Sequence, residues 1–482
     1  MTETKKQTAG RSFLYKLAES VGTQGISFIV GIVLARLLSP ADFGLLTLLT
    51  VFINLSRVFV QSGLNTALVQ RLTVDETDLS SVFYLSLGIA GGCYALLYFG
   101  APLVADFYRL PELTPLMRVL ALTLLPGALS TVQQAVVARQ MAFRRLMLGS
   151  IVANVLSGAV GVGMAYAGMG AWALVGQQLS NQVILCVVLL FLVDWRPRLL
   201  YSWQRVKGLL GFGWKLLVSS LIETLYNNLR SLVIGKRYAS DVVGQYNRGK
   251  LFPELVMNNV NGSIQSVMLP VFASEQENRE RLKAMMRRTI MVSSYLVFPM
   301  MAGLALVARP LVLLLLTEKW LPCVPFLWIA CVDFAFYPVH TTNLQAISAM
   351  GRSDVFLRLE IIKKTYGVLI LLASVLFFDD VLVIAAGSVV STLIATFVNA
   401  APNKRLLGYR YLEQVKDLLP SLGLTAVMGG AVWLAGLLPL GDLPLLLTQT
   451  AVGAGVYAGL SLLLKPQAYV QMADMVKAVR RR

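Results

Sequence analysis

Basic and amide side chains recur along one face of an apolar segment, residues 43–69. Arg57 stands near the middle of this segment, in the stretch TVFINLSRVFVQSG, where a cation costs about 2.5–3.5 kcal/mol in a membrane helix. At about 100° per residue, Arg57 shares an arc of roughly 80° with Asn54, Gln61 and Asn65. A guanidinium group binds phosphate oxygens through paired hydrogen bonds, and amides suit sugar hydroxyls. The spacing therefore predicts a site for an anionic ligand rich in hydroxyls.

The same polar pattern returns 200 positions later, in the apolar segment 241–274. Residues 32–44, IVLARLLSPADFG, align with residues 232–244, LVIGKRYASDVVG. In both copies an apolar helix is expected to end and a short acidic turn to follow, and the next helix restarts at Gly44 or Gly244. The polar residues of the second copy again share an arc of roughly 80°; they are Asn247, Lys250, Glu254, Asn258, Asn261 and Gln265. Such a stripe cannot face lipid, since each unpaired polar group in hydrocarbon costs several kcal/mol. A repeat with a polar face on each copy indicates two related halves around a wet cavity.

Neighbouring segments add further polar residues to this predicted cavity. Segment 208–236 places Glu223, Asn227 and Arg230 on one face, and the first apolar segment carries Glu19. Candidate buried cations outnumber the candidate acids, so a phosphate, a diphosphate or an acidic sugar is expected. The cations are Lys16, Arg57, Arg118, Lys215, Arg230, Arg248 and Lys250. The candidate ligand-binding residues are Asn54, Arg57, Gln61, Asn65, Asn227, Arg230, Lys250, Asn258 and Asn261. The acids Glu19, Glu223 and Glu254 are candidates either for coupling to H⁺ or Na⁺ or for plain counter-ions.

Plainer explanations exist for several of these residues. Polar stripes also hold helices together in membranes. Lys250 and Glu254 are four residues apart and can simply pair with each other. His340, the single histidine, is expected to be a hydrogen-bonded packing residue rather than a proton relay. Arg57 and Arg230 lie deepest in their segments, so the binding hypothesis depends on them most.

The elements that must position these residues are membrane helices. Of 482 residues, 56% are hydrophobic and 14% are charged, and the mean hydropathy is +0.68, whereas a soluble chain carries about 25% charged residues. At about 20 apolar residues per span, the sequence predicts an all-α polytopic membrane protein with about fourteen transmembrane helices. They are expected at residues 12–36, 43–69, 78–101, 111–137, 144–167, 170–193, 208–236, 241–274, 283–308, 322–349, 355–378, 381–403, 417–438 and 443–464.

Basic residues are concentrated in alternate connections between these segments. With both termini in the cytoplasm, most loop Lys and Arg residues fall on the cytoplasmic side, as the positive-inside rule requires. This bias explains the net charge of +17, so no nucleic-acid partner is expected. Most connections are only a few residues long, which leaves no room for a soluble catalytic domain and argues against an enzyme. The 4 cysteines lack metal-ligand spacing, and neither a metal site nor a cofactor is expected.

The repeat also predicts the domain organisation. Residues 1–200 are expected to form an N-terminal lobe of six helices and residues 201–405 a C-terminal lobe of six. Residues 406–482 are expected to supply two extra helices and a basic cytoplasmic tail. A polar cavity between two pseudo-symmetric lobes is typical of transporters that work by alternating access.

The chain resembles a known family of transporters. The stretches ARLLSPADFGLLTLLTVFINLSRVFVQSGLNTALVQ and GQYNRGKLFPELVMNN, together with the fourteen-span plan, are similar to Wzx-type polysaccharide flippases. These belong to the multidrug/oligosaccharidyl-lipid/polysaccharide (MOP) exporter superfamily, and the likeness is to its colanic-acid and teichuronic-acid exporter branch. The resemblance covers essentially the whole chain and implies the MOP flippase fold, a V-shaped pair of lobes. Related lipid II flippases place arginines in the cavity, and Arg57 matches such a position.

The resemblance further implies a cargo and partners. The cargo would be an undecaprenyl-diphosphate-linked oligosaccharide repeat unit, moved across the cytoplasmic membrane for surface polysaccharide biosynthesis. Its lipid tail would stay among membrane lipids in a groove beside helices 417–438 and 443–464, and a polysaccharide polymerase is a further partner. Two alternatives remain within the superfamily: a cation-coupled multidrug exporter and a lipid II flippase. A membrane-embedded glycosyltransferase would need large outer loops with catalytic acids, which the sequence lacks.

Overall fold

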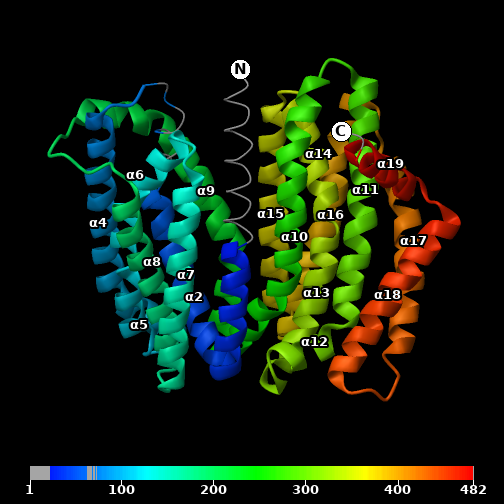
Figure 1. Cartoon of the computed structure of the whole chain (residues 1–482), viewed down its shortest axis with the longest axis horizontal. Coiled ribbons are helices and arrows are strands. Elements are labelled where there is room, and N and C mark those ends of the chain that lie inside the picture. The colour runs from blue at the N-terminus through cyan, green and yellow to red at the C-terminus, as the bar shows by residue number, and fades with distance from the viewer. Residues whose placement is uncertain (1–21, 62–67, 69–70, 72, 481–482) are drawn as a thin grey trace. The chain divides into compact units, whose positions relative to one another are not determined.

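Helices make up every regular element of the described chain (Figure 1). The computed structural model describes residues 22–61, 68, 71 and 73–480. Its first helix spans Gly22–Leu37. The next are α2 (Pro40–Gln61), α4 (Glu76–Tyr108), α5 (Leu113–Ala121), α6 (Leu124–Arg139), α7 (Phe143–Tyr166), α8 (Ala171–Leu192) and α9 (Trp203–Arg237). Then come α10 (Ser240–Ser274), α11 (Arg279–Leu306), α12 (Ala308–Leu315), the short 3₁₀ helix η1 (Glu318–Cys323), α13 (Val324–Ala335), α14 (Tyr337–Ala349), α15 (Ser353–Phe377), α16 (Val381–Leu407), α17 (Tyr411–Ala435), α18 (Asp442–Leu464) and α19 (Gln467–Arg480).

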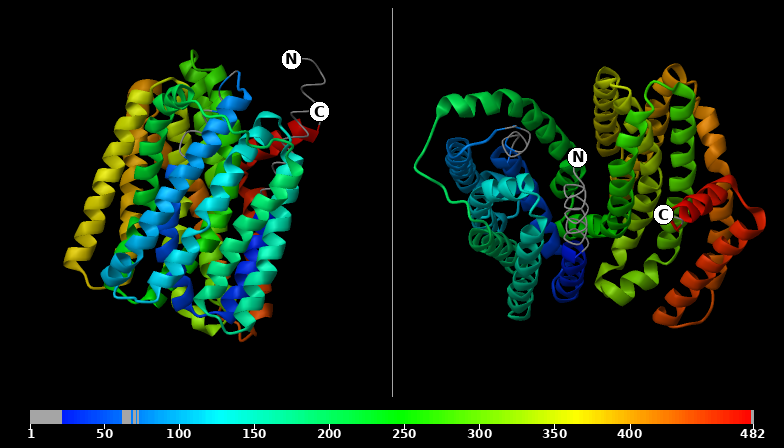
Figure 2. Two further views of the ribbon diagram at one scale, coloured as in Figure 1. Left: turned by 90° about the vertical axis from the view of Figure 1, so that its left-hand side faces the viewer. Right: turned by 45° about the horizontal axis from the view of Figure 1, so that its top comes forward.

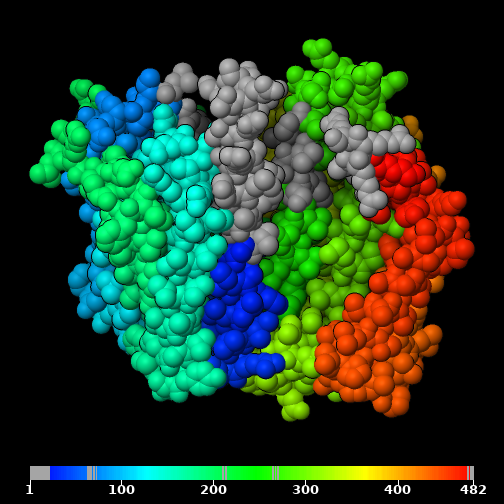
Figure 3. Space-filling view, in the orientation of Figure 1, coloured from blue at the N-terminus to red at the C-terminus, as the bar shows by residue number. Residues whose placement is uncertain are grey.

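The prediction of an all-α membrane protein is confirmed. Within the described residues, 10 helical stretches are long and apolar enough to cross a membrane. The first predicted segment, 12–36, is described only from Gly22, and the second is described as a helix to Gln61. Many large apolar side chains are exposed, for example Trp433 on α17 and Leu447 on α18. In the space-filling view, the orange residues of α17 and α18 form part of the visible surface (Figure 3). Such exposed apolar side chains suit contact with lipid.

Contacts divide the chain into two compact units, Met1–Gly244 and Gln245–Arg482. The long helix α9 packs against α2 and α4 and therefore belongs to the first unit. The division into lobes at residues 200 and 405, which follows the sequence repeat, stays a prediction.

The repeat is present in the helix boundaries themselves. Helix α9 ends at Arg237, 200 positions after Leu37, where the first described helix ends. Helix α10 begins at Ser240, 200 positions after Pro40, where α2 begins. The two copies therefore share their helix–turn–helix register as well as their polar pattern.

Two segments predicted as single helices are interrupted. Segment 111–137 forms α5 and α6, and segment 322–349 forms α13 and α14. Each interruption is followed by a proline, Pro126 or Pro338, at the start of the second helix. Because proline has no N–H, the carbonyl four residues earlier loses its helical partner. Both interruptions lie within stretches apolar enough to span the membrane.

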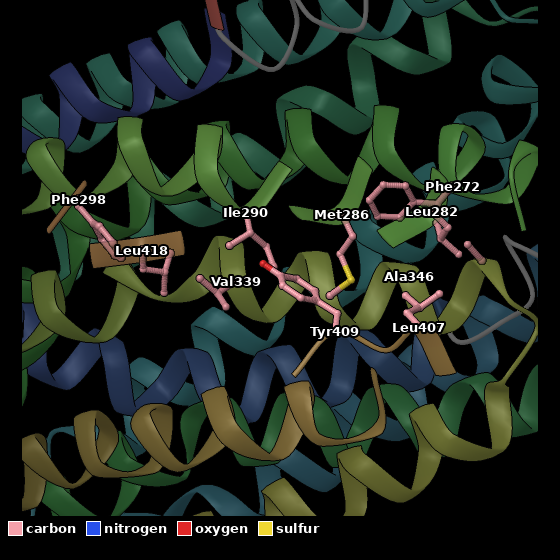
Figure 4. Close-up of a cluster of buried hydrophobic side chains, with 11 residues drawn as sticks. Phe272, Leu282, Met286, Ile290, Phe298, Val339, Ala346, Leu407, Tyr409 and Leu418 are labelled. Carbon is pink, nitrogen blue, oxygen red and sulfur yellow. The ribbon is translucent and has the colours of Figure 1, made fainter. Parts of the chain in front are cut away.

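Apolar packing holds each unit together. In the second unit, the ring of Tyr409 lies in a core of buried side chains that includes Met286, Ile290 and Val339 (Figure 4). These residues come from α11, α14 and the turn between α16 and α17. In the first unit, the connection between α8 and α9 loops outward before α9 begins (Figure 2).

That connection is held to the start of α4 by polar contacts. The backbone N–H of Ser202 donates to Ser81 Oγ at 2.9 Å, and Arg205 forms ion pairs with Asp75 and Asp78. Asp75 also caps α4, because its carboxylate accepts a hydrogen bond from the backbone N–H of Asp78 at 2.9 Å. The start of α9 is therefore tied to the start of α4.

Candidate functional site

Arg57 lines a cavity of about 210 Å³ inside the first unit. Three helices contribute its walls: α2, α6 and α8. The other polar lining residues are Gln61, Thr123, Gln134 and Gln182. The rest of the lining is apolar or small: Val60, Leu124, Gly127 and Leu185. A guanidinium group and three amides thus share one small cavity, with no acidic residue among the lining side chains.

The helix interruption between α5 and α6 forms one wall of this cavity. Thr123 is fully buried at the interruption, and its hydroxyl donates to the carbonyl oxygen of Leu120 at 2.7 Å. Gly127 follows one turn later, and a Cβ at this position would lie 3.6 Å from Gln182 Nε2. Gly127 and the Gln182 amide are therefore neighbours in the cavity wall.

Arg57 has no charge partner in the described part of the chain. Its side chain is half-buried, and it forms neither an ion pair nor a hydrogen bond with another described residue. Of the neighbouring amides, Gln134 donates a long hydrogen bond of 3.4 Å to Ser130 Oγ. A half-buried cation without a counter-ion favours the binding of an anion. The amides can hydrogen-bond to the oxygens of the same ligand.

The other candidates of the first stripe are less well placed or fall outside the description. Asn54 is half-buried on α2 and does not line the cavity. Asn65 and Glu19 lie outside the described residues. From this stripe, the structure therefore brings together Arg57 and Gln61.

The candidates on α9 lie at the surface or close to it. Asn227 and Glu223 are exposed, and Arg230 is half-buried. The Nε atom of Arg230 is buried without a hydrogen-bond partner among the described residues. Arg230 thus resembles Arg57 in being a cation with unused hydrogen-bonding capacity.

The candidates on α10 belong to the second unit. Glu254 and Asn258 are exposed, and Asn261 is buried with its Oδ1 unpartnered in the described chain. The Lys250 ammonium lies 5.3 Å from the centre of the Tyr246 ring. Glu254 forms no ion pair within the described residues, so the simple pairing of Lys250 with Glu254 is not observed.

Sequence reasoning missed the residues that α6 and α8 bring to Arg57. Gln134 and Gln182 lie on segments predicted as helices, but neither was among the candidates. The one candidate on these two segments was the cation Arg118, which does not line the cavity. A signal for Gln182 is present, because GQQLSNQ, residues 176–182, is a polar run inside an apolar helix. Gln134 has a weaker signal, the pair Gln133–Gln134 within α6.

The sequence matches a family model described as "Polysaccharide biosynthesis protein" over residues 33–325. The chain belongs to this polysaccharide biosynthesis protein family. The matched region contains α2, α6 and α8, and therefore the whole Arg57 cavity.

Three curated relatives of this polysaccharide biosynthesis protein are similar over most of its length. The succinoglycan biosynthesis transport protein ExoT of Rhizobium meliloti (strain 1021) is 26% identical over 74% of this chain and 72% of its own. The lipopolysaccharide biosynthesis protein WzxC of Escherichia coli (strain K12) is 26% identical over 70% of this chain and 69% of its own. The teichuronic acid biosynthesis protein TuaB of Bacillus subtilis (strain 168) is 27% identical over 62% of each chain.

Solved structures of membrane transporters share the fold of this family member. The lipid II flippase MurJ superimposes with a TM-score of 0.78 over 94% of this chain and 98% of its own, at 13% identity. An inward-facing MATE family transporter of the MOP superfamily gives a TM-score of 0.61 over 82% of this chain and 95% of its own, at 16% identity. The expected MOP flippase fold is therefore confirmed.

Proposed function

We propose that this protein moves a lipid-linked oligosaccharide, joined to its polyprenyl carrier through a diphosphate, across the cytoplasmic membrane. The cargo is an undecaprenyl-diphosphate-linked repeat unit for surface polysaccharide biosynthesis, and movement occurs by alternating access. Family membership and the names of the curated relatives support the class of cargo. The protein then acts as a transporter and not as an enzyme.

The observation that carries the proposal is the unpartnered Arg57 guanidinium in a polar, acid-free cavity of the described chain. A diphosphate needs such a cation, because transferring its charge from water into a membrane protein requires compensation. The cavity volume of about 210 Å³ lies below the ~300–1,000 Å³ of pockets for drug-sized ligands. It suits a phosphate group and the adjoining sugar, so the remaining glycan and the polyprenyl chain extend beyond it.

The same cavity argues against the two alternatives in the superfamily. A cation-coupled multidrug exporter takes up positively charged drugs, which an arginine without a neighbouring acid would repel. The likeness to a lipid II flippase rests on the fold alone at 13% identity. The curated relatives are named instead for succinoglycan, lipopolysaccharide and teichuronic acid biosynthesis.

The setting of the transporter follows from its charge distribution. We place it in the cytoplasmic (inner) membrane with both termini in the cytoplasm, because that orientation puts most loop Lys and Arg residues inside. Membrane lipids surround the cargo's tail, and a polysaccharide polymerase receives the glycan on the outer side. Arg230, Lys250 and the exposed polar residues of α9 and α10 are proposed further contacts for the glycan or the diphosphate.

The test replaces Arg57 by Gln or Lys and measures transport of lipid-linked oligosaccharide into vesicles and the amount of surface polysaccharide in cells. A charged hydrogen bond is worth ~1.5–3 kcal/mol, so Arg57→Gln should slow transport about 10- to 100-fold. Arg57→Lys keeps the charge but loses paired hydrogen bonding, and should fall in between. Arg309→Gln, at an exposed position on α12, is the matched control. Normal transport by Arg57→Gln at equal protein level would overturn the proposal.

A further inference from the structure

A second cavity, of about 250 Å³, lies near one end of the helices of the second unit. Its walls come from α11, α17 and the connection between α18 and α19. The lining residues follow closely on the starts of α11 and α17 and on the end of α18. Because α11, α17 and α18 are each apolar enough to cross a membrane, their ends belong at its surface. The cavity therefore lies close to a membrane surface.

The charge of this cavity is positive. Two cations line it, Arg287 and Lys416. The acid in its wall, Asp417, is already compensated, because it accepts two hydrogen bonds from Arg287 and one from the Tyr409 hydroxyl. Lys416 is exposed and forms no ion pair with another residue of the described chain. The same is true of Lys465, which follows the end of α18 beside the cavity. The surplus of cations favours an anionic ligand.

The cavity wall also supplies neutral hydrogen-bond donors. Ser421 lies buried in it, and Gln467 contributes an amide. Gln467 and Ala468 open α19, so the N–H groups of its first turn have no helical acceptor. Phosphate oxygens accept hydrogen bonds from hydroxyls, amides and backbone N–H groups as well as from cations. These donors therefore suit a phosphate that the cations attract.

Helix α19 begins in the cavity wall and runs crosswise to α17 and α18 (Figure 1, Figure 2). With 14 residues it is too short to span a membrane. Its apolar side packs on α11, where Ala468 and Met472 join a core cluster with Met291. Arg288 of α11 also donates a hydrogen bond to the carbonyl oxygen of Gln471 at 3.1 Å. The start of α19 is therefore held in place beside the cavity.

The surroundings of the cavity favour a lipid over a small anion. Lys477 and residues 480–482 make the sequence basic towards the end of α19, and such clusters beside membrane helices attract anionic lipids. Leu419, next to a lining residue of α17, is 55% exposed, and the leucines at 462–464 are 59–80% exposed. Exposed leucines suit acyl chains, whereas a free phosphate gains nothing from them.

We propose that this cavity binds the headgroup of an anionic phospholipid, such as phosphatidylglycerol, whose acyl chains lie among the exposed leucines. Lys416 and Lys465 contact the phosphate. The cavity is smaller than the ~300–1,000 Å³ of pockets for drug-sized ligands, so it holds the phosphate and glycerol and leaves the chains outside. It shares no lining residue with the Arg57 cavity. That the lipid comes from the inner leaflet rests on the proposed orientation, whereas the site itself does not depend on the cargo.

The experiment titrates the purified, delipidated full-length protein in a neutral detergent with soluble short-chain lipids. Dihexanoyl phosphatidylglycerol should bind, which is measured as an adduct by native mass spectrometry and as a raised unfolding temperature. Dihexanoyl phosphatidylcholine has the same acyl chains but no net charge, and it should bind at least about tenfold more weakly. Added salt should weaken the binding of phosphatidylglycerol, because it screens exposed charges.

Two variants test the lysines directly. Lys416→Gln and Lys465→Gln each remove an unpartnered cation and keep the pair between Arg287 and Asp417. Each should weaken phosphatidylglycerol binding about fivefold, the contribution of one basic residue at an anionic membrane surface. Lys207→Gln, at an exposed position on α9 in the first unit, is the matched control and should bind as the wild type does. Because all three positions are exposed, the variants should unfold at the wild-type temperature without lipid.

Other results would overturn the proposal. Equal binding of the two lipids, or wild-type affinity in both Lys416→Gln and Lys465→Gln, would mean that the cavity does not recognise a charged headgroup. Equal protection by inorganic phosphate would assign the cavity to a free anion. Tighter binding of farnesyl diphosphate, weakened by the same two substitutions, would assign it to the diphosphate of the cargo. No arm measures transport, so failure of the lipid site and failure of the proposed function remain distinguishable.

Discussion

Gly44 and Gly244 lie against each other where α2 and α10 begin: a Cβ on either residue would come within 3.2 Å of the other's backbone nitrogen. Each glycine also lies close to the carbonyl group four residues before the other glycine. A Cβ on Gly44 would lie 1.7 Å from the carbonyl oxygen of Ser240, and one on Gly244 would lie 2.0 Å from that of Pro40. The two copies of the repeat thus meet through backbone atoms at their matching positions.

Replacing Gly44 by Ala should therefore destabilise the protein. No side-chain adjustment relieves a clash with a backbone carbonyl, so the helix starts must separate, at a cost of about 1–3 kcal/mol or more. The thermal unfolding temperature in detergent measures this cost. Gly91→Ala on α4 is the matched control, because a methyl group added there would meet nothing within 4 Å, and alanine favours helix at this position. Equal unfolding temperatures for the two variants would contradict the close contact.

The ion pair between Arg287 and Asp417 should contribute more to stability than a similar pair at the surface. Arg287 donates two hydrogen bonds to Asp417, at 2.7 and 2.6 Å, and the Tyr409 hydroxyl donates a third at 2.6 Å. The Asp417 side chain is only 5% exposed. Arg287→Gln should cost about 1–3 kcal/mol in unfolding free energy, chiefly because a buried carboxylate loses its charge partner.

A second ion pair that is joined by two hydrogen bonds provides the control for this prediction. Arg352 also donates two hydrogen bonds to one carboxylate, that of Asp354, at 2.9 and 2.7 Å. The Asp354 side chain is 64% exposed, so water screens the pair. Arg352→Gln should change the unfolding temperature little. If Arg352→Gln lowers the stability as much as Arg287→Gln does, burial of Asp417 is not the reason for the contribution of the first pair.

Asp75 should make stability depend on pH in the acidic range. The backbone N–H of Asp78 and the side chain of Arg205 both hold the pKa of Asp75 below its usual value. A lowered pKa in the folded state means that Asp75 contributes stability above its unfolded pKa of about 3.9. That contribution is lost as the pH falls through the folded pKa.

Asp75→Asn tests this dependence, because Asn still caps the helix but carries no charge. The unfolding temperature of the variant should lie below that of the wild type at pH 7. The difference should shrink as the pH falls towards 3. A difference that stays constant over this range would show that the charge of Asp75 plays no part.

Hydropathy and helical periodicity were enough to predict the helices and the polar residues that α2 contributes to the cavity. Arg57 and Gln61 lie on one face at about 100° per residue, and both line the cavity. The interruptions at Leu122 and Phe336 were missed because hydropathy averages over a break of one or two residues. Pro126 and Pro338 carried the missing signal.

The opposite side of the cavity depends on packing between distant segments. Gln182 lines the same cavity as Arg57 because α8 packs against α6 and α2 in the first unit. Nothing in the local sequence of α8 specifies that neighbour.

The amides of the Arg57 cavity should contribute to transport and little to stability. Gln134 and Gln182 line the cavity, and a neutral hydrogen bond to the cargo is worth ~0.5–1.5 kcal/mol, so Gln134→Ala or Gln182→Ala should slow transport about 2- to 10-fold. Combining Gln182→Ala with Arg57→Gln should slow transport less than the product of the two effects, because the residues act on one ligand.

Gln133 provides the control, since it neighbours Gln134 but does not line the cavity. Its side chain is fully buried, and neither amide atom has a partner in the described part of the chain. Gln133→Leu removes this unsatisfied amide and should raise the unfolding free energy by about 1 kcal/mol while leaving transport unchanged. Equal loss of transport in the Gln133, Gln134 and Gln182 variants would mean that α6 and α8 matter only as packing, and the cavity would not be where the cargo binds.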